Sequence, residues 1–292
     1  ADGEAGVAVA LERRPGLVLV ALASLSALAE DDPVFRSLHH GFISSVGPSV
    51  GVGDLDGDQV PDVAFTTSDS VRLARGRGDG SFVLDPPQYV PGMGARDLAL
   101  ADLDLDGNLD LVTCGPLHEV QVALGHGDLS FSPAQTYLVE GVPPSLVVTE
   151  VNGDGLPDLV LGRQSGVRFD LLLGVGGGLF GPSQSFGPTA QDPRVTAAGD
   201  FDGDGDIDVA TASSNAISIG ILHNSGAGSF SGPLSLPVQG VTAMVAGDLN
   251  EDGRDDLVVC AGHFVSWMIG YSPLKTRVHL AGPLASFPLV LD

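Results

Sequence analysis

Short apolar segments recur along the chain at a nearly constant spacing, and each repeat contains several of them. The first segments read SVGVGD, DLALAD, SLVVTE, VTAAGD and AMVAGD. The second segments read DVAFT, DLVTC, DLVLG, DVATA and DLVVC, and the third read VRLAR, VQVAL, FDLLL, ISIGIL and VSWMIG. Small or polar residues alternate with apolar ones, and turn residues separate the segments. This pattern is typical of strands rather than helices, so we predict an all-β fold.

A glycine-rich turn that ends in an aromatic residue follows the third segment in four of the repeats. These turns end at Phe82, Phe131, Phe180 and Phe230. We predict that a fourth strand begins at each of these residues. Four antiparallel strands in a repeat of 48 to 50 residues match the size of one β-propeller blade.

The two ends of the chain complete the ring in this prediction. Residues 2–12 match the second half of a repeat, and a strand is expected at 7–11. A further strand is expected at 17–23. At the other end of the chain, residues 284–292 match a first strand. Antiparallel pairing of 284–292 with 7–11 makes a sixth blade and leaves no open sheet edge. We therefore predict one β-propeller domain over residues 1–292, with six four-stranded blades closed by the terminal strands.

An acidic loop joins the first and second segments of each repeat, and the five loops start at residues 54, 102, 150, 200 and 248. Positions 1, 3, 5 and 9 of the loops hold Asp54, Asp56, Asp58 and Asp62; Asp102, Asp104, Asp106 and Asp110; Glu150, Asn152, Asp154 and Asp158; Asp200, Asp202, Asp204 and Asp208; Asp248, Asn250, Asp252 and Asp256. Every one of these side chains carries an oxygen. Ca²⁺ takes about six to eight oxygen ligands, so we expect about five structural calcium ions.

Composition narrows the classes of partner. The formal net charge is −24, which argues against nucleic acid and against an anionic lipid surface; 18 of the acidic side chains occupy the loop positions above. Cys114 and Cys260 occupy equivalent strands, so we expect two free, buried thiols. No apolar run is long enough for a membrane span. Residues 13–31 resemble a secretory signal, although part of them also fits a strand, and both interpretations stay open.

The loops and the G-x-G-x-F turns together resemble the FG-GAP/VCBS repeats of integrin-α-type β-propellers. The resemblance implies that position 7 supplies a backbone carbonyl, at Val60, Asn108, Leu156, Asp206 and Arg254. It also makes seven blades the alternative to six. The EF-hand and dockerin loops need an acidic residue at position 12 and flanking helices. Position 12 is Phe65, Thr113, Leu161, Thr211 and Val259, so these loops are excluded, and metal-free acidic turns are the remaining alternative.

Catalysis has little support in the sequence, because its seven histidines lie outside H-E-x-x-H and G-x-S-x-G motifs. We therefore expect no enzyme. Arg77-Gly78-Asp79 spells an integrin-recognition tripeptide, but it falls in a repeat turn where Gly and Asp are expected. We interpret it as a coincidence.

The surface opposite the acidic loops is the expected ligand face. Its candidate residues are Arg13, Arg14, His118, Arg163, Arg194 and His263. Our first hypothesis is an extracellular, calcium-stabilised propeller that mediates adhesion or protein interaction, since weak calcium sites are typical of extracellular modules. The alternatives are a lectin-like glycan binder and a self-assembling subunit of a surface layer or filament.

Overall fold

The computed structural model describes residues 7–8, 23–24, 46–67, 70–84, 95–164, 166–189, 192–261, 264–269 and 277–281. The chain divides into two compact units, Ala1–Ile43 and Ser44–Asp292. In the first unit, β1 (Val7–Ala8) pairs antiparallel with β2 (Ala23–Ser24). β1 lies within the predicted strand 7–11, and β2 begins at Ala23, the last residue of the predicted strand 17–23. The single domain over residues 1–292 stays a prediction.

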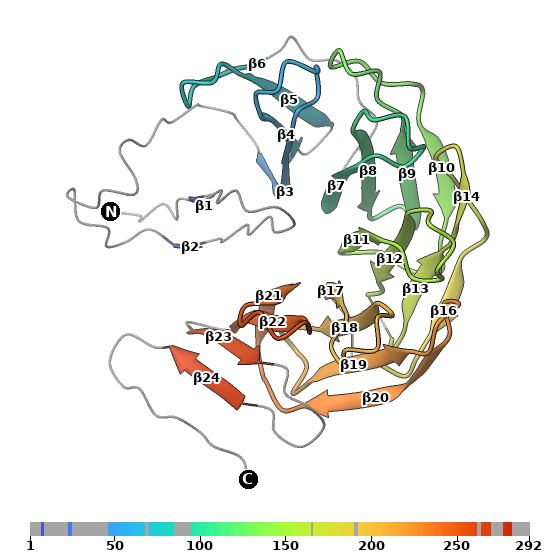
Figure 1. The fold of residues 1–292 in the computed structure, drawn as a ribbon, viewed down its shortest axis with the longest axis vertical. Coiled ribbons are helices and arrows are strands. Elements are labelled where there is room, and N and C mark those ends of the chain that lie inside the picture. Colours follow the sequence, from blue (N-terminus) through green and yellow to red (C-terminus); the bar gives the residue numbers. More distant parts are fainter. Residues whose placement is uncertain are drawn as a thin grey trace, which may run out of the picture. The chain divides into compact units, whose positions relative to one another are not determined.

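The second unit contains five four-stranded antiparallel sheets, which we number in chain order (Figure 1). Sheet 1 consists of β3 (Val46–Gly53), β4 (Asp62–Thr67), β5 (Val71–Gly76) and β6 (Phe82–Leu84). Sheet 2 consists of β7 (Asp97–Ala101), β8 (Asp110–Gly115), β9 (Glu119–Ala123) and β10 (Gln135–Leu138). Sheet 3 consists of β11 (Leu146–Thr149), β12 (Asp158–Gly162), β13 (Phe169–Leu172) and β16 (Gln184–Phe186). Sheet 4 consists of β17 (Val195–Gly199), β18 (Asp208–Ala212), β19 (Ile219–Asn224) and β20 (Phe230–Leu236). Sheet 5 consists of β21 (Val241–Gly247), β22 (Asp256–Ala261), β23 (Phe264–Ile269) and β24 (Arg277–Ala281).

The strand order confirms the predicted all-β fold of four-stranded antiparallel sheets. Within each sheet the strands pair in the order of the sequence, and a small hairpin of β14 (Gly174–Gly176) and β15 (Leu179–Phe180) lies between β13 and β16. The first strands of successive sheets contact one another, and Figure 1 shows them on the inner side of the five sheets. This succession of twisted sheets is propeller-like. Six blades and ring closure stay predictions, because residues 284–292 lie outside the described part of the chain.

The hydrophobic core lies between neighbouring sheets. One cluster combines Val112 and Val120 of sheet 2 with Leu159 of sheet 3, and similar clusters join sheets 1 and 2, 3 and 4, and 4 and 5. Every residue of β8, β12 and β18 is buried, because these second strands have a sheet on either face. Small residues are needed where the first strands meet: a Cβ on Gly51 would lie 2.8 Å from Leu98 Cδ1.

Hydrogen bonds also cross from sheet to sheet. Asp97 of β7 accepts from Ser49 Oγ of sheet 1 at 2.7 Å and from Leu146 N of sheet 3 at 2.9 Å. Farther along, Ser145 Oγ and Thr196 Oγ1 lie 3.0 Å apart between sheets 3 and 4. Sheet registration therefore depends on polar contacts as well as on apolar packing.

The fourth strands begin where predicted in sheets 1 and 4 but not in sheets 2 and 3. Phe131 forms only an isolated bridge with Gly125, Phe180 ends the β14–β15 hairpin, and the fourth strands start at Gln135 and Gln184. A proline follows two residues after the aromatic residue in both cases. Proline has no N–H to donate to the ladder, which interrupts the pairing.

Cys114 and Cys260 are both free as predicted, but the expected burial of Cys260 is wrong: it is only half-buried on β22, whereas Cys114 is buried.

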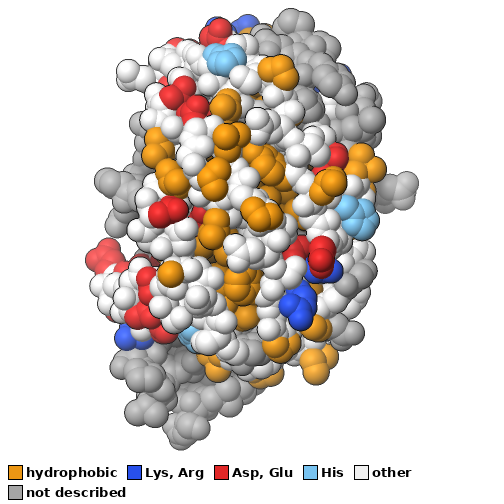
Figure 2. All heavy atoms as spheres, turned by 90° about the vertical axis from the view of Figure 1, so that its right-hand side faces the viewer, with side chains coloured by type: hydrophobic (Ala, Val, Ile, Leu, Met, Phe, Trp, Pro, Cys, Tyr) orange, Lys and Arg blue, Asp and Glu red, His pale blue; other side chains and the backbone are white. Residues whose placement is uncertain are grey.

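Exposed apolar side chains occur on the outer strands, among them Leu138 of β10 and Val175 of β14, and Figure 2 shows apolar side chains spread over one face of the molecule. The described residues contain no helix that is long and apolar enough to cross a membrane.

Candidate metal centre

Each acidic loop joins the first strand of a sheet to the second, and its own backbone orients its carboxylates. In loop 1, Asp54 Oδ1 accepts from Gly57 N and Oδ2 accepts from Gln59 N, both at 2.8 Å. Asp58 Oδ1 accepts from Val60 N at 2.8 Å. Gly57 and Gln59 have positive φ angles of 76° and 67°, which makes the turn tight. The alternation of Asp with residues that tolerate this conformation therefore forms the loop locally.

The aspartate at position 9 also connects the loop to the third strand. Asp62, which is fully buried, accepts from Leu55 N at 2.9 Å and from Gly76 N at 2.8 Å, one bond to each carboxylate oxygen. The same pair of bonds forms at Asp110, Asp158 and Asp208. Burial raises the pKa of each of these three carboxyl groups, although the backbone N–H groups oppose the shift. Position 9 is thus a structural clamp in addition to a candidate ligand.

The structure brings acidic ligand atoms together in loops 1, 2 and 4. Oxygens within 4.8 Å of one another come from Asp54, Asp56 and Asp58 in loop 1, from Asp102, Asp104 and Asp110 in loop 2, and from Asp200, Asp202 and Asp204 in loop 4. In the described parts of loops 3 and 5, no three acidic or histidine side chains gather in this way. Both loops have Asn at position 3, and the amide Nδ2 of Asn152 donates to Asp154 at 3.0 Å.

The donor chemistry of the three clusters fits calcium. Carboxylate oxygens are hard ligands, and a dication relieves the repulsion among three of them. In loop 1 an arginine of the protein also relieves this repulsion, because Arg75 Nε lies 3.0 Å from Asp56 Oδ2. Desolvation nevertheless raises the pKa of Asp56, and the neighbouring carboxylates add to that shift. The ligand role of each loop residue stays a prediction.

Three of the ligand-face candidates lie at the strand ends opposite the loops. His118 is exposed in the β8–β9 turn with a φ of 58°. Arg163 follows β12 and pairs with Glu140 at 3.1 Å and with Asp170 at 3.6 Å. Arg194 precedes β17 and pairs with Asp192 at 2.8 Å. Arg13, Arg14 and His263 lie outside the described residues.

The Arg77-Gly78-Asp79 tripeptide lies in the exposed β5–β6 turn. Asp79 Oδ1 accepts from Ser81 N at 2.9 Å, and Asp128 Oδ1 accepts from Ser130 N in the equivalent turn of sheet 2. The aspartate therefore has a turn-forming role that repeats without the tripeptide.

Sequence reasoning missed two residues beside the loops, Arg75 and His223. Each stands at the same place in its third strand, and each directs a nitrogen toward position 3 of its own loop. Neither belongs to a sequence motif, and their positions beside the loops follow from the strand register that the structure supplies.

The fold and the repeated acidic loops define a β-propeller-like repeat protein. The model of the FG-GAP-like repeat matches residues 54–113, 150–211 and 200–259, which is more than half of the chain. The chain therefore belongs to the FG-GAP-like repeat family. A search among curated proteins found no significant match.

Several solved structures share the fold. An Agrocybe aegerita lectin, described as recognising non-reducing terminal N-acetylglucosamine, is 17% identical, with a TM-score of 0.53 over 78% of this chain and 73% of the lectin. BBS1N, solved in complex with ARL6DN, is 15% identical, with a TM-score of 0.52 over 82% of this chain and 76% of that one. A functionally unknown Desulfotomaculum acetoxidans protein is 17% identical, with a TM-score of 0.52 over 81% and 69%. At these identities the likeness concerns the fold alone.

Proposed function

We propose that this chain is an extracellular, non-catalytic β-propeller that binds calcium through its acidic loops and binds a protein partner at the opposite strand ends. The acidic clusters carry the calcium part of the proposal, because loops 1, 2 and 4 each bring three carboxylates within 4.8 Å at the same place in their sheets. We include the sixth blade and ring closure by residues 284–292 in this proposal.

Exposed apolar residues support a protein partner. Leu117, Val167 and Ile217 lie between the second and third strands of sheets 2, 3 and 4, and their exposed fractions are 59%, 43% and 72%. They share the strand ends opposite the acidic loops with His118 and Arg163. Apolar side chains in a polar surround are typical of protein interaction sites.

The calcium part is tested by removing metal from the purified chain and titrating Ca²⁺ by calorimetry, with thermal melts in calcium and in chelator. A ligand that binds only the native state adds about 2.7 kcal/mol per site at 100 times its Kd. We therefore expect a marked loss of melting temperature in chelator. Identical melts, together with no heat of Ca²⁺ binding, would contradict the proposal.

The partner part is tested by cell-surface binding of the native chain and of a triple variant, Leu117→Ser, Val167→Ser and Ile217→Ser. We expect loss of binding with an unchanged melt. A matched variant, Leu138→Ser, changes an apolar residue that is 78% exposed on the outer strand β10 and should bind normally. Equal loss in both variants would overturn the choice of face.

Glycan binding is the second candidate, favoured by the structural likeness to the Agrocybe aegerita lectin. A glycan array distinguishes it from protein binding, since a lectin should show dose-dependent signals that a free sugar displaces. The third candidate, self-assembly into a surface layer or filament, should show concentration-dependent polymers in electron micrographs.

A further inference from the structure

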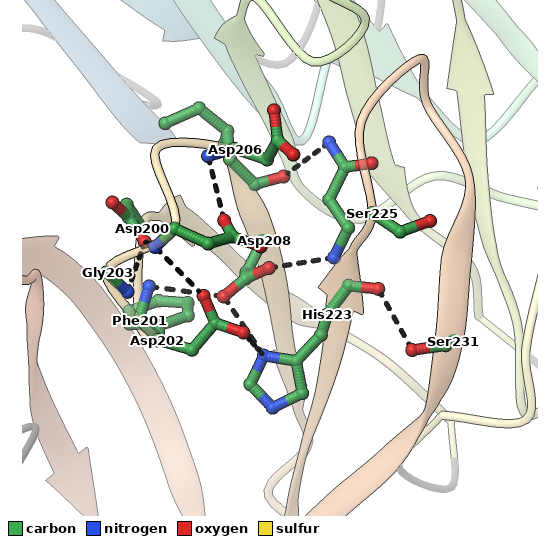
Figure 3. Close-up of polar contacts among 12 residues, drawn as sticks. Asp200, Phe201, Asp202, Gly203, Asp206, Asp208, His223, Ser225 and Ser231 are labelled. Carbon is green, nitrogen blue, oxygen red and sulfur yellow. Dashed lines mark hydrogen bonds and ion pairs between the residues drawn. The ribbon is translucent and has the colours of Figure 1, made fainter. Parts of the chain in front are cut away.

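One side chain makes the acidic site of loop 4 chemically different from the others. His223 lies near the end of β19, and its Nδ1 is 3.3 Å from Asp202 Oδ2 and 3.2 Å from Asp208 Oδ2. Figure 3 shows the imidazole facing both carboxylates. The ligand atoms of these three residues all lie within 4.8 Å of one another.

We propose that His223, Asp202 and Asp208 form a binding site for a borderline transition-metal dication such as Zn²⁺, and that this ion outcompetes Ca²⁺ for the carboxylates of loop 4. Imidazole nitrogen is a preferred ligand of such ions, whereas Ca²⁺ is bound through oxygen. Tetrahedral Zn²⁺ ligands with bonds of about 2.0–2.2 Å lie about 3.3–3.6 Å apart. The two nitrogen–oxygen separations are close to this range, and all three ligand atoms lie within 4.8 Å of one another. One ion can therefore contact all three groups once the side chains adjust around it.

The position of His223 is equivalent to residues with no metal-binding atom in the other sheets. In each sheet, one residue of the third strand pairs with the second residue of the second strand. The next residue in the chain is the equivalent of His223. The equivalent residues are Arg75, Leu124, Leu173 and Ile269. Leucine and isoleucine have no donor atom, and the arginine guanidinium has no acceptor lone pair. Loop 4 alone therefore combines acidic oxygens with an imidazole at this position.

The local fold holds two of the three groups in place. Asp208 is fully buried, and its oxygens accept from Phe201 N at 3.2 Å and from Asn224 N at 2.8 Å. Asn224 follows His223 directly, so the bond that anchors Asp208 also places the histidine over the loop. The side chains of His223 and Asp202 are 30% and 39% exposed, which leaves the ion a route from solvent.

The competing interpretation is a metal-free ion pair. Arg75 pairs with Asp56 in loop 1 at 3.0 Å, and a charged imidazole could play the same part in loop 4. The two interpretations differ in one measurable respect: only a metal site requires His223 to bind a dication through its ring nitrogen.

The experiment uses the full chain, freed of metal, with Co²⁺ as the spectroscopic probe. We expect one Co²⁺ with visible ligand-field bands, displaced by Zn²⁺ at equal concentration and not by Ca²⁺. His223→Leu copies Leu124 and Leu173. It should lower Co²⁺ and Zn²⁺ affinity by about 100-fold or more, since even outer-shell changes cost about 10–100-fold.

A matched control is His126→Asn, which changes an exposed histidine that belongs to none of the metal-type clusters among the described residues. It should leave Co²⁺ binding unchanged. Equal affinity of the native chain and His223→Leu, or a native chain without ligand-field bands, would overturn the proposal.

Two readouts keep the test independent of folding and of calcium. Thermal melts and Ca²⁺ calorimetry on His223→Leu show whether the variant folds and whether the other loops still bind. In the native chain, long-range ¹H–¹⁵N spectra should show a shift of one histidine ring nitrogen on Zn²⁺ addition, and this shift should be missing from His223→Leu. Unchanged ring nitrogens at saturating Zn²⁺ refute the site, while failure of Ca²⁺ binding alone refutes only the calcium proposal.

Discussion

Replacement of Asp97 by alanine should destabilise the junction of the first three sheets. The carboxylate accepts from Ser49 Oγ at 2.7 Å, from Leu98 N at 3.0 Å and from Leu146 N at 2.9 Å. Hydrogen bonds to a charged group contribute about 1.5–3 kcal/mol each. Partial burial offsets part of this sum, since desolvation raises the pKa of Asp97 despite these bonds.

We therefore expect Asp97→Ala to lower the free energy of unfolding by about 3 kcal/mol. For a unit of this size, that change corresponds to about 6–12 °C in melting temperature. Differential scanning calorimetry in calcium buffer measures it. Ser49→Ala removes only one of the three donors and should cost about 1 kcal/mol.

A double-mutant cycle tests the contact directly. The combined variant should be more stable than the sum of the single effects predicts, because both single changes remove the same bond. Additive effects, or a melt of Asp97→Ala within one degree of the native chain, would show that the bridge does not hold the sheets together.

Acid should increase the stability that is lost when Asp97 is replaced. The pKa of Asp97 is raised in the folded state, so the folded state holds the proton more tightly than the unfolded chain. The contribution of this group to stability is greatest below the ordinary carboxyl pKa and falls as the pH rises through the raised value. The stability difference between the native chain and Asp97→Asn should change in that window. A difference independent of pH would contradict the shift.

Three further predictions concern packing, charge and closure. Gly125→Ala should lose about 2 kcal/mol or more, because its Cβ would overlap the backbone oxygen of Leu109; a normal denaturant midpoint would refute this. Arg163→Ala should lower stability by about 1–2 kcal/mol, because it removes the guanidinium that lies 3.6 Å from Asp170, whose side chain is 3% exposed. Glu140→Ala, at a side chain 74% exposed, should cost less than about 0.5 kcal/mol, and equal melting temperatures of the two variants would contradict the assignment. Deletion of residues 284–292 should open the proposed ring and lower the melting temperature far more than loss of a frayed end; an unchanged melt would rule out closure by this segment.

Sequence alone was sufficient for features that depend on neighbours along the chain. The alternation of apolar residues predicted the strands, and the spacing of Asp54, Asp56 and Asp58 predicted a turn whose carboxylates converge. Both follow from backbone geometry over a few residues. The fivefold recurrence then predicted four-stranded antiparallel sheets, which the structure confirms for the described residues, while the sixth blade stays a prediction.

Tertiary structure decided whatever depends on groups distant in the sequence. His223 lies 15 residues from Asp208 and meets it only because β18 and β19 pair in one particular register. Asp97 joins side chains and backbone 48 and 49 residues away, although nothing in its own segment marks it. The fourth strands of sheets 2 and 3 begin late because a proline interrupts a ladder that only the folded sheet defines. Local patterns therefore specified the repeat, while strand register and sheet packing specified which polar groups meet.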